Sequence, residues 1–447
     1  MAKNTSKLLS GETPASPTGY IVKQIILYTN LEENNKLDIR GMVSRITVTE
    51  SIYTGSVQTD LVILDASNLI EELKLNGQER IHIKIGRVEG DEKNREQIEF
   101  DTYIADIKNY SRNLPGAASY EFKCLSEHML VNNTKTISRA FENTTGNLIK
   151  KICSSDLGIK KTDNINTDSN NIKGIYPRLR PYAAIKWLVQ NSFDASSSPY
   201  YFYETVRDGV KFKSYGELIE ADPHNHPVDD PYIHDAFFKE TVGSEQYYKE
   251  AKRKIRKLSS DLNMSKYISA GEGAFASQTH KIDIYNKNYK TTKWQYKSLK
   301  KLNQHKPFIE RDFKQFGGRP LNKCDTGKNY FISLNSGNKD NYSSPLKDNI
   351  NKSYGYLGNE SILSHDIELA GDFSLQPGAV IHVKFLKTNL QGAAIQIDRV
   401  LTGKYLVTSI THEFGDEYIM DVRIKTDSFG ADLNDITPII EEVPTGA

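Results

Sequence analysis

Cysteine is nearly absent from this chain of 447 residues, which contains only Cys124, Cys153 and Cys324. The number is odd and the spacings are long, so the sequence argues against a disulfide framework and indicates assembly in a reducing cytoplasm. No cysteine or histidine spacing matches a structural zinc site. We therefore expect a fold that needs neither a metal ion nor a cofactor.

Long apolar runs are also missing. No stretch approaches the roughly 20 apolar residues that a membrane span requires, and the polar segment 1–17 lacks the apolar core of a signal peptide. Lysine and arginine number 58 against 57 acidic residues, so the formal net charge is +1. No overall field attracts nucleic acid or an anionic membrane. These features predict a soluble protein, or part of a soluble assembly, with no membrane partner.

Catalytic signatures are absent too: the sequence has no GxSxG motif, no P-loop and no dinucleotide fingerprint. The sharpest candidate is Asp222–His226, in which His224 and His226 could ligate a metal if the segment were a strand. Pro223 and the prolines that follow predict a loop instead. We therefore keep His224 and His226 as weak metal candidates and predict no catalytic or cofactor-binding residue.

A short phrase that occurs twice is the most informative feature present. Ile81–Ile85 returns as Ile381–Phe385, 300 positions later, and similar strand patterns follow both copies. An aromatic residue opens the last two strands each time, which predicts one small antiparallel β-domain used twice. The repeat is carried by Ile81, Ile83, Tyr103 and Tyr120 in the first copy, and by Ile381, Val383, Gly403, Lys404, Tyr405 and Tyr418 in the second.

A short helix is predicted at Asp65–Leu73, and longer helical spacing lies in the middle of the chain. It predicts one helix near 143–153, capped by Asn143 or Thr144, and another near 181–190 that begins at Pro181. A hairpin around Asp208 and Gly209 follows. The predicted fold class is α+β and mostly β, with two similar antiparallel β tube-like or barrel-like domains and an inserted mixed α/β domain.

The predicted domain boundaries follow the changes in pattern. The two ends of the chain read as arms, and the second β-domain is interrupted by an insertion. The boundaries are a disordered arm at 1–18, a first tube-like domain at 19–130, an outer mixed domain at 131–198 and 236–364, a second tube-like domain at 199–235 and 365–430, and a C-terminal arm at 431–447.

Two segments within the insertion could bind nucleic acid. The basic run Lys249–Lys257 could contact phosphate, although a solvated helix face or a docking surface for an acidic partner is the preferred interpretation. The aromatic and basic stretch Tyr285–Leu302 resembles a stacking platform, but packing on a sheet suits the neutral chain better. The tract Gly317–Ser361, rich in Gly, Asn, Ser and Lys, predicts loops.

Taken in order, these elements resemble the central baseplate hub protein of contractile-tailed bacteriophages of the T-even type. They are also similar to the hub part of the type VI secretion spike protein VgrG. The resemblance is carried by Phe100–Ser126, Ile137–Phe141, Pro181–Val189, Tyr200–Leu218 and Leu401–His412.

The resemblance implies a homotrimer whose six tube-like domains form a pseudo-sixfold ring between the sixfold tail tube and the threefold spike. It implies the spike, tail tube and tube-initiator proteins as partners, and possible contacts with wedge and tape-measure proteins. DNA would pass through the channel without specific binding. The location would be the virion baseplate, after synthesis in the host cytoplasm.

Two other functions compete with this structural role. One is a peptidoglycan-degrading tail enzyme with its site in the loop 222–234 or in the middle region. The other is a nucleic-acid-binding protein that uses the basic and aromatic stretches. In the hub family lysozyme activity often belongs to the separate spike protein, so the resemblance implies that this chain is not an enzyme.

Overall fold

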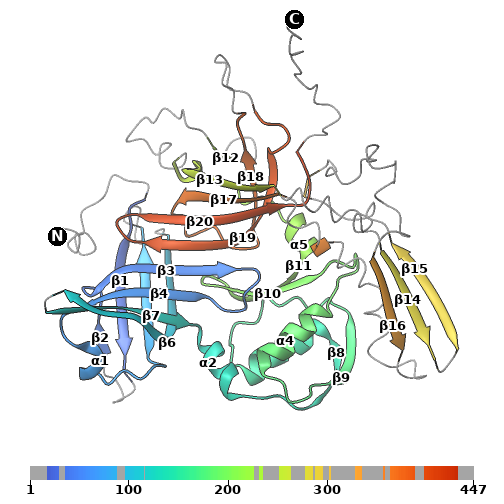
Figure 1. Ribbon diagram of the computed structural model, residues 1–447, viewed down its shortest axis with the longest axis horizontal. Coiled ribbons are helices and arrows are strands. Elements are labelled where there is room, and N and C mark those ends of the chain that lie inside the picture. The colour runs from blue at the N-terminus through green and yellow to red at the C-terminus, as the bar shows by residue number, and fades with distance from the viewer. Residues whose placement is uncertain are drawn as a thin grey trace, which may run out of the picture.

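A computed structural model gives the fold of this protein (Figure 1). Both predicted terminal arms lie almost entirely outside the residues that it describes. Those residues are 18–29, 36–87, 96–114, 116–225, 231–234, 251–262, 277–284, 287–294, 302–303, 328–334, 356–357, 363–387 and 397–430.

The first repeat is an antiparallel sheet whose strands bury every second residue. Ile81, Ile83 and Ile85 are fully buried, whereas the side chains between them point outward, which is the period of a half-buried strand. The elements are β1 (Ile21–Tyr28), β2 (Lys36–Asp38), β3 (Val43–Ser51), β4 (Gln58–Asp65), α1 (Leu69–Glu72), β5 (Arg80–Gly86), β6 (Gln97–Leu114) and β7 (Ala117–Leu125).

The second repeat is assembled from segments on both sides of the insertion. Its core residues Val383, Val407 and Ile424 belong to the same apolar cluster as the core of the first repeat. The strands are β12 (Tyr232–Ile233), β13 (Lys257–Leu262), β17 (Leu363–Ala370), β18 (Val380–Lys384), β19 (Gly403–Phe414) and β20 (Tyr418–Thr426).

The two repeats have the same strand order. The first runs β3-β4-β7-β6-β5-β1, and the second runs β13-β17-β20-β19-β18-β12. Even an irregularity is shared, because the pairing register shifts between Ile104 and Asp106 in β6 and between Val407 and Ser409 in β19. One detail differs: β1 is antiparallel to β5, whereas the two-residue β12 is parallel to β18. The predicted mostly-β fold class is confirmed.

An outer domain with its own apolar core follows the first repeat. The predicted helices and hairpin are present: Thr144 caps α3 by accepting from the Asn147 N–H, Pro181 opens α4, and Cys153 is buried. The elements are α2 (Glu127–Thr134), β8 (Ala140–Thr144), α3 (Thr145–Lys151), the π-helical turn η1 (Ile152–Asp156), β9 (Asn171–Ile175), α4 (Pro181–Gln190), β10 (Tyr200–Thr205), β11 (Gly209–Ser214) and α5 (Tyr215–Glu220).

The hairpin β10–β11 forms a sheet of its own and separates two cores. Tyr200 and Phe202 pack into the outer domain, whereas Tyr201 and Tyr203 pack against a cluster that contains Val380 of the second repeat. Alternation along β10 thus joins the outer domain to the second repeat.

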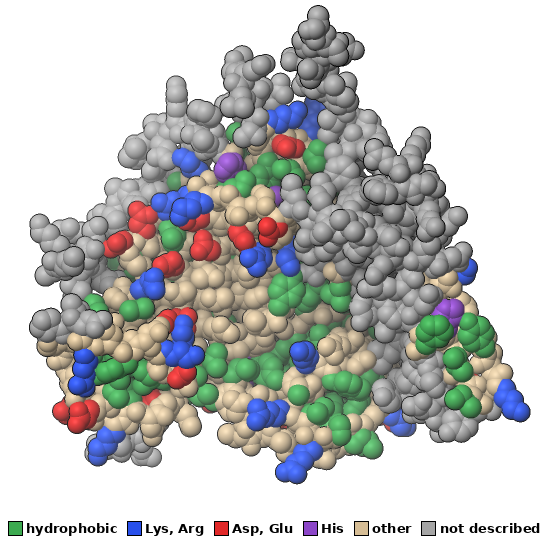
Figure 2. Space-filling view, in the orientation of Figure 1, with side chains coloured by type: hydrophobic (Ala, Val, Ile, Leu, Met, Phe, Trp, Pro, Cys, Tyr) green, Lys and Arg blue, Asp and Glu red, His purple; other side chains and the backbone are tan. Residues whose placement is uncertain are grey.

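A small satellite sheet lies to one side of the large sheet that the two repeats share (Figure 1). It consists of β14 (Ser277–Asp283), β15 (Asn288–Trp294) and β16 (Lys328–Leu334). The tract predicted to form loops therefore contains a strand, β16. Tyr289 lies on a sheet as expected, but it is 60% exposed and Phe331 is 71% exposed. Figure 2 shows hydrophobic side chains gathered on this sheet.

Gly371, which follows β17, offers a test of packing in the second repeat. A Cβ atom there would lie 2.0 Å from the Tyr418 ring, which is fully buried and cannot move away. We expect G371A to lower the free energy of unfolding by about 1–3 kcal/mol, the usual cost of overpacking, as measured by urea denaturation. Gly415 has open space around its Cβ position, so G415A is the matched control. Equal effects of the two substitutions would contradict this packing.

Candidate functional site: the seam between the two repeats

The two repeats are joined edge to edge by main-chain hydrogen bonds. The first half of β19 pairs with β18 inside its own repeat, and its second half pairs with β3 of the other repeat. The antiparallel register places Ser409 opposite Ser51 and Phe414 opposite Ile46. Because both strands would otherwise be edges, this seam satisfies two rows of backbone groups at once.

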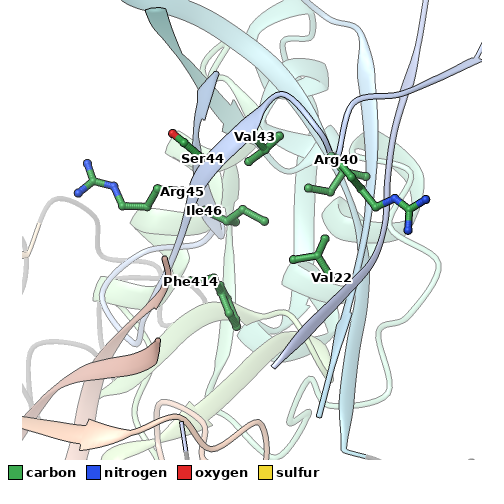
Figure 3. Close-up of a pocket in the computed structure, with 8 residues that line it drawn as sticks. Val22, Arg40, Val43, Ser44, Arg45, Ile46 and Phe414 are labelled. Atoms are coloured by element: carbon green, nitrogen blue, oxygen red, sulfur yellow. The ribbon is translucent and has the colours of Figure 1, made fainter. Parts of the chain in front are cut away.

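Apolar side chains close the inner side of the seam. Phe414 of the second repeat enters the core of the first, with its ring 5.3 Å from Tyr20 and 4.4 Å from Tyr418. Figure 3 shows Val22, Ile46 and Phe414 around a hollow between β1, β3 and β19. Its volume is about 10 Å³, room for at most one water molecule. The hollow is a packing gap and not a ligand site.

A buried polar group also lies at the seam. Glu50 on β3 is 4% exposed and lies 3.9 Å from the Nε2 atom of His412 on β19. The Nδ1 atom of His412 is 2.9 Å from the Tyr418 hydroxyl. Burial raises the pKa of Glu50 to about 8 and lowers the pKa of His412 to about 4, so both side chains are neutral near pH 7.

Glu204 fixes the outer domain to the first repeat close to this seam. Its carboxylate accepts from the Val57 N–H at 2.9 Å and from the Ser126 hydroxyl at 2.5 Å. The Nε2 atom of His128 lies 3.0 Å from the other carboxylate oxygen. Two segments of the chain therefore meet on one side chain of β10, which ties hairpin β10–β11 to the first repeat.

The opposite face of the sheet is polar and ion-paired in both repeats. Lys123 on β7 lies 2.7 Å from Asp60 on β4, and Arg423 on β20 lies 2.7 Å from Asp366 on β17. Each pair stands directly across neighbouring strands at the same place in its repeat. Figure 2 shows acidic and basic side chains side by side over β17, β20 and β19. This face therefore has little unbalanced charge.

The structure places the predicted repeat residues on matching strands. Ile81 and Ile83 are buried on β5, and Ile381 and Val383 are buried on β18. The tyrosines are less regular. Tyr103 pairs with Arg80 whereas Tyr405 pairs with Ile381, so the two tyrosines differ by one position in their strands. Met420 occupies the place in β20 that Tyr120 has in β7.

The structure explains why Gly403 and Lys404 open strand β19. The side-chain amide of Asn303 accepts from the Lys404 N–H at 2.8 Å and donates to its carbonyl at 3.1 Å, as a neighbouring strand would. A Cβ atom at Gly403 would lie 2.7 Å from the Asn303 side chain. The glycine therefore leaves space for an anchor that holds the insertion on β19.

The described part of the basic run, which begins after Lys249, is not a solvated helix face. Lys252 lies 3.1 Å from Glu96 of the first repeat, and Arg253 lies 3.8 Å from Asp372 in the second. Next along the chain, Arg256 and Lys257 pair with Glu368, and Arg256 also pairs with Glu417. The run bridges the two repeats, so its acidic partners belong to the same chain.

His224 has polar neighbours that superficially resemble a hydrolase triad. Its Nε2 atom lies 3.3 Å from the Ser374 hydroxyl and 3.9 Å from the Asp372 carboxylate. A catalytic triad needs serine and carboxylate on opposite ring nitrogens, so this arrangement cannot relay a proton. His226 lies outside the described residues. Among those described there is neither a metal-ligating cluster nor a helix long and apolar enough to cross a membrane.

Sequence reasoning missed Glu50 and Glu204, although Glu50 left a signal. Ile46, Val48 and Glu50 occupy successive inward positions of β3, so a carboxylate stands where the pattern requires an apolar residue. An ionisable group at an inward position indicates a buried partner. Glu204 has no comparable signal, because its partners come from two distant segments, one at Val57 and one at Ser126 and His128.

The seam should make stability depend on pH. Glu50 has a pKa of about 8 in the folded chain against 4.5 when unfolded, so the folded state binds more protons between these values. The free energy of unfolding then falls as pH rises through this interval. His412 and His365 act oppositely, but only between about 4 and 6.5.

Between pH 6.5 and 8 we therefore expect a loss of roughly 2 kcal/mol from Glu50. Urea denaturation across this range should show the loss in the native chain and a nearly flat profile in E50Q. E413Q, on the exposed side of the seam, should keep the native slope. An unchanged slope in E50Q would contradict the buried neutral carboxyl.

Neither a protein-family model nor a curated protein sequence matches the chain. Solved structures do. A tail protein from Neisseria meningitidis is similar with a TM-score of 0.51 and 11% identity, over 91% of this chain and 96% of that one. The 43 kDa tail protein of prophage MuSo2 from Shewanella oneidensis has a TM-score of 0.49 and 10% identity, over 91% and 99% of the two chains.

The VgrG-containing PdpA–VgrG complex of Francisella is also similar, with a TM-score of 0.44 and 11% identity over 94% of this chain and 53% of that one. At these identities the comparison shows only the fold. This conclusion rests on the Neisseria tail protein, whose TM-score is 0.51. The predicted resemblance is confirmed at that level: this chain has the fold of a tail protein.

Proposed function

We propose that this chain is the central hub subunit of a contractile tail baseplate, a structural protein that joins a sixfold tail tube to a threefold spike. The observation that carries the proposal is one chain containing two copies of the same β-domain, joined edge to edge. The tail-protein fold supports it.

The seam β3–β19 implies further copies of the chain. It uses the first strand of one repeat and the fourth strand of the other, in the order given above. Within the described residues, the second half of the fourth strand of the first repeat, β6, on its side away from β7, and the outer edge of the first strand of the second, β13, have no partner strand. A heterologous contact of this kind closes into a ring if its rotation is a whole fraction of a turn. Three chains would supply six domains and match both neighbouring symmetries.

The polar face suits a channel that DNA crosses without being held. Basic side chains on it, such as Lys123 and Arg423, already face carboxylates across the strands. Paired cations offer little to phosphate, so the counterion release that drives DNA binding is small. The proposed partners are the spike, the tube and tube-initiator proteins, and wedge or tape-measure proteins, all in the virion baseplate.

A peptidoglycan-degrading function finds no support in the described residues, where His224 lacks triad geometry. We expect no clearing in a lytic zymogram with purified protein. Clearing that disappeared in H224A/H226A would instead favour the enzyme.

The hub function predicts a defined assembly. Negative-stain electron microscopy of the chain co-expressed with the spike protein of the same tail should show threefold rings with a central pore and six similar lobes. Mass photometry of this complex should give the mass of three copies of the chain in addition to the mass of the bound spike. Monomers that persist in the presence of the spike would contradict the hub.

A further inference from the structure

We infer that chains join through one defined seam, in which β6 of one chain pairs with β13 of the next, Ile107 opposite Leu262 and Lys108 opposite Asp261. The inference rests on the proposed ring and specifies its contact. It identifies the partner surface as a second copy of this chain and gives the register.

The register follows from the equivalence of the repeats. The main-chain groups of Ile104 pair with residues 78 and 79, and those of Val407 pair with residues 378 and 379. Ile104 and Val407 are therefore equivalent, and the same register shift follows each of them. A residue of β6 thus corresponds to the residue of β19 that is 303 positions later, so that Lys108 corresponds to Thr411.

The same reasoning places β13 on β3. In the first repeat, Ile46 of β3 pairs with Leu61, which pairs with Phe122 of β7. In the second, Leu258 of β13 pairs with Ile367, which pairs with Val422 of β20. Phe122 and Val422 are equivalent, because Cys124 and Ile424 pair with the equivalent residues Ile104 and Val407. Leu258 therefore corresponds to Ile46, and Asp261 corresponds to Thr49.

Within the chain, Thr49 stands opposite Thr411 with their hydroxyl oxygens 3.5 Å apart. The equivalent pair between chains is Asp261 and Lys108. A lysine and an aspartate directly across an antiparallel pair attract each other. The charges on the two edges are thus complementary at the position that the register selects.

Both edges are open in the part of the chain that the structure describes. No described strand pairs with the outer side of β13, or with β6 beyond Ile104 on the side away from β7. Lys108 and Asp261 are exposed. Lys108 has a neighbour in its own strand, Asp106, at 3.4 Å, a surface pair that is worth little.

The seam between chains should be the weaker of the two. The internal seam extends to Phe414 opposite Ile46, and both side chains are buried. The regular course of β6 ends early, because Asn109 has a φ of 55° and the register with β7 shifts after Lys108. We therefore expect the isolated chain to form rings only at high concentration or on the spike.

Cysteine crosslinking tests this register. In a C324S background, K108C/D261C should give covalently closed trimers when assembled rings are oxidised and analysed on a non-reducing gel. K108C/S259C, two positions away along β13, is the matched control and should link at least about fivefold less. T49C/T411C should link within a single chain and add no mass.

A second variant set tests the charge pair. D261K should weaken each seam by about fivefold, and K108D/D261K should restore trimer formation in mass photometry. Rings that form but do not link through K108C/D261C above the control would overturn this register and leave the hub function intact. A complete absence of rings in the presence of the spike would overturn both.

Discussion

The need to pair the edge of a β-sheet governs the architecture of this chain. An open strand leaves a row of N–H and C=O groups without partners, and pairing or covering them is the general solution. Here β3 and β19 satisfy each other across the boundary of the two repeats. The continuous sheet, the shared core and the position of the outer domain all depend on that pairing.

Buried side chains keep the joined repeats in one geometry. Phe414 crosses from one core into the other, Glu50 and His412 are held neutral within the seam, and Glu204 attaches the outer domain next to it. Lys252 forms an ion pair with the first repeat, and Arg253 forms one with the second. These contacts join segments that are far apart in the sequence.

The sequence was informative wherever a pattern is local. Alternation in Ile81–Ile85 and its second copy revealed the duplication, and Thr144 and Pro181 marked two helix starts. Pairing across strands was not predictable in this way. Tyr103 and Tyr405 look equivalent along the chain yet differ by one position in register, since a shared motif does not fix a hydrogen-bond partner.

Charge partners were equally hidden. The run that contains Lys252 and Arg256 read as solvated because its carboxylates lie more than a hundred residues away in the sequence. Strand β16 was hidden in a tract whose composition is typical of loops. For the candidate site, only the strands and the inward position of Glu50 could be read in advance.

Covalent fusion of the two repeats has an evolutionary consequence. In a ring of six identical chains, every substitution at an edge changes all six contacts together. Here the contact inside the chain is formed by β3 and β19, whereas the proposed contact between chains uses two other strands, β6 and β13. In the proposed ring, selection could therefore adjust the contact between chains, and with it the timing of assembly, while the internal contact stays fixed. Two similar but separate repeats in one chain would thus give the proposed ring two joints that can change independently, in place of one.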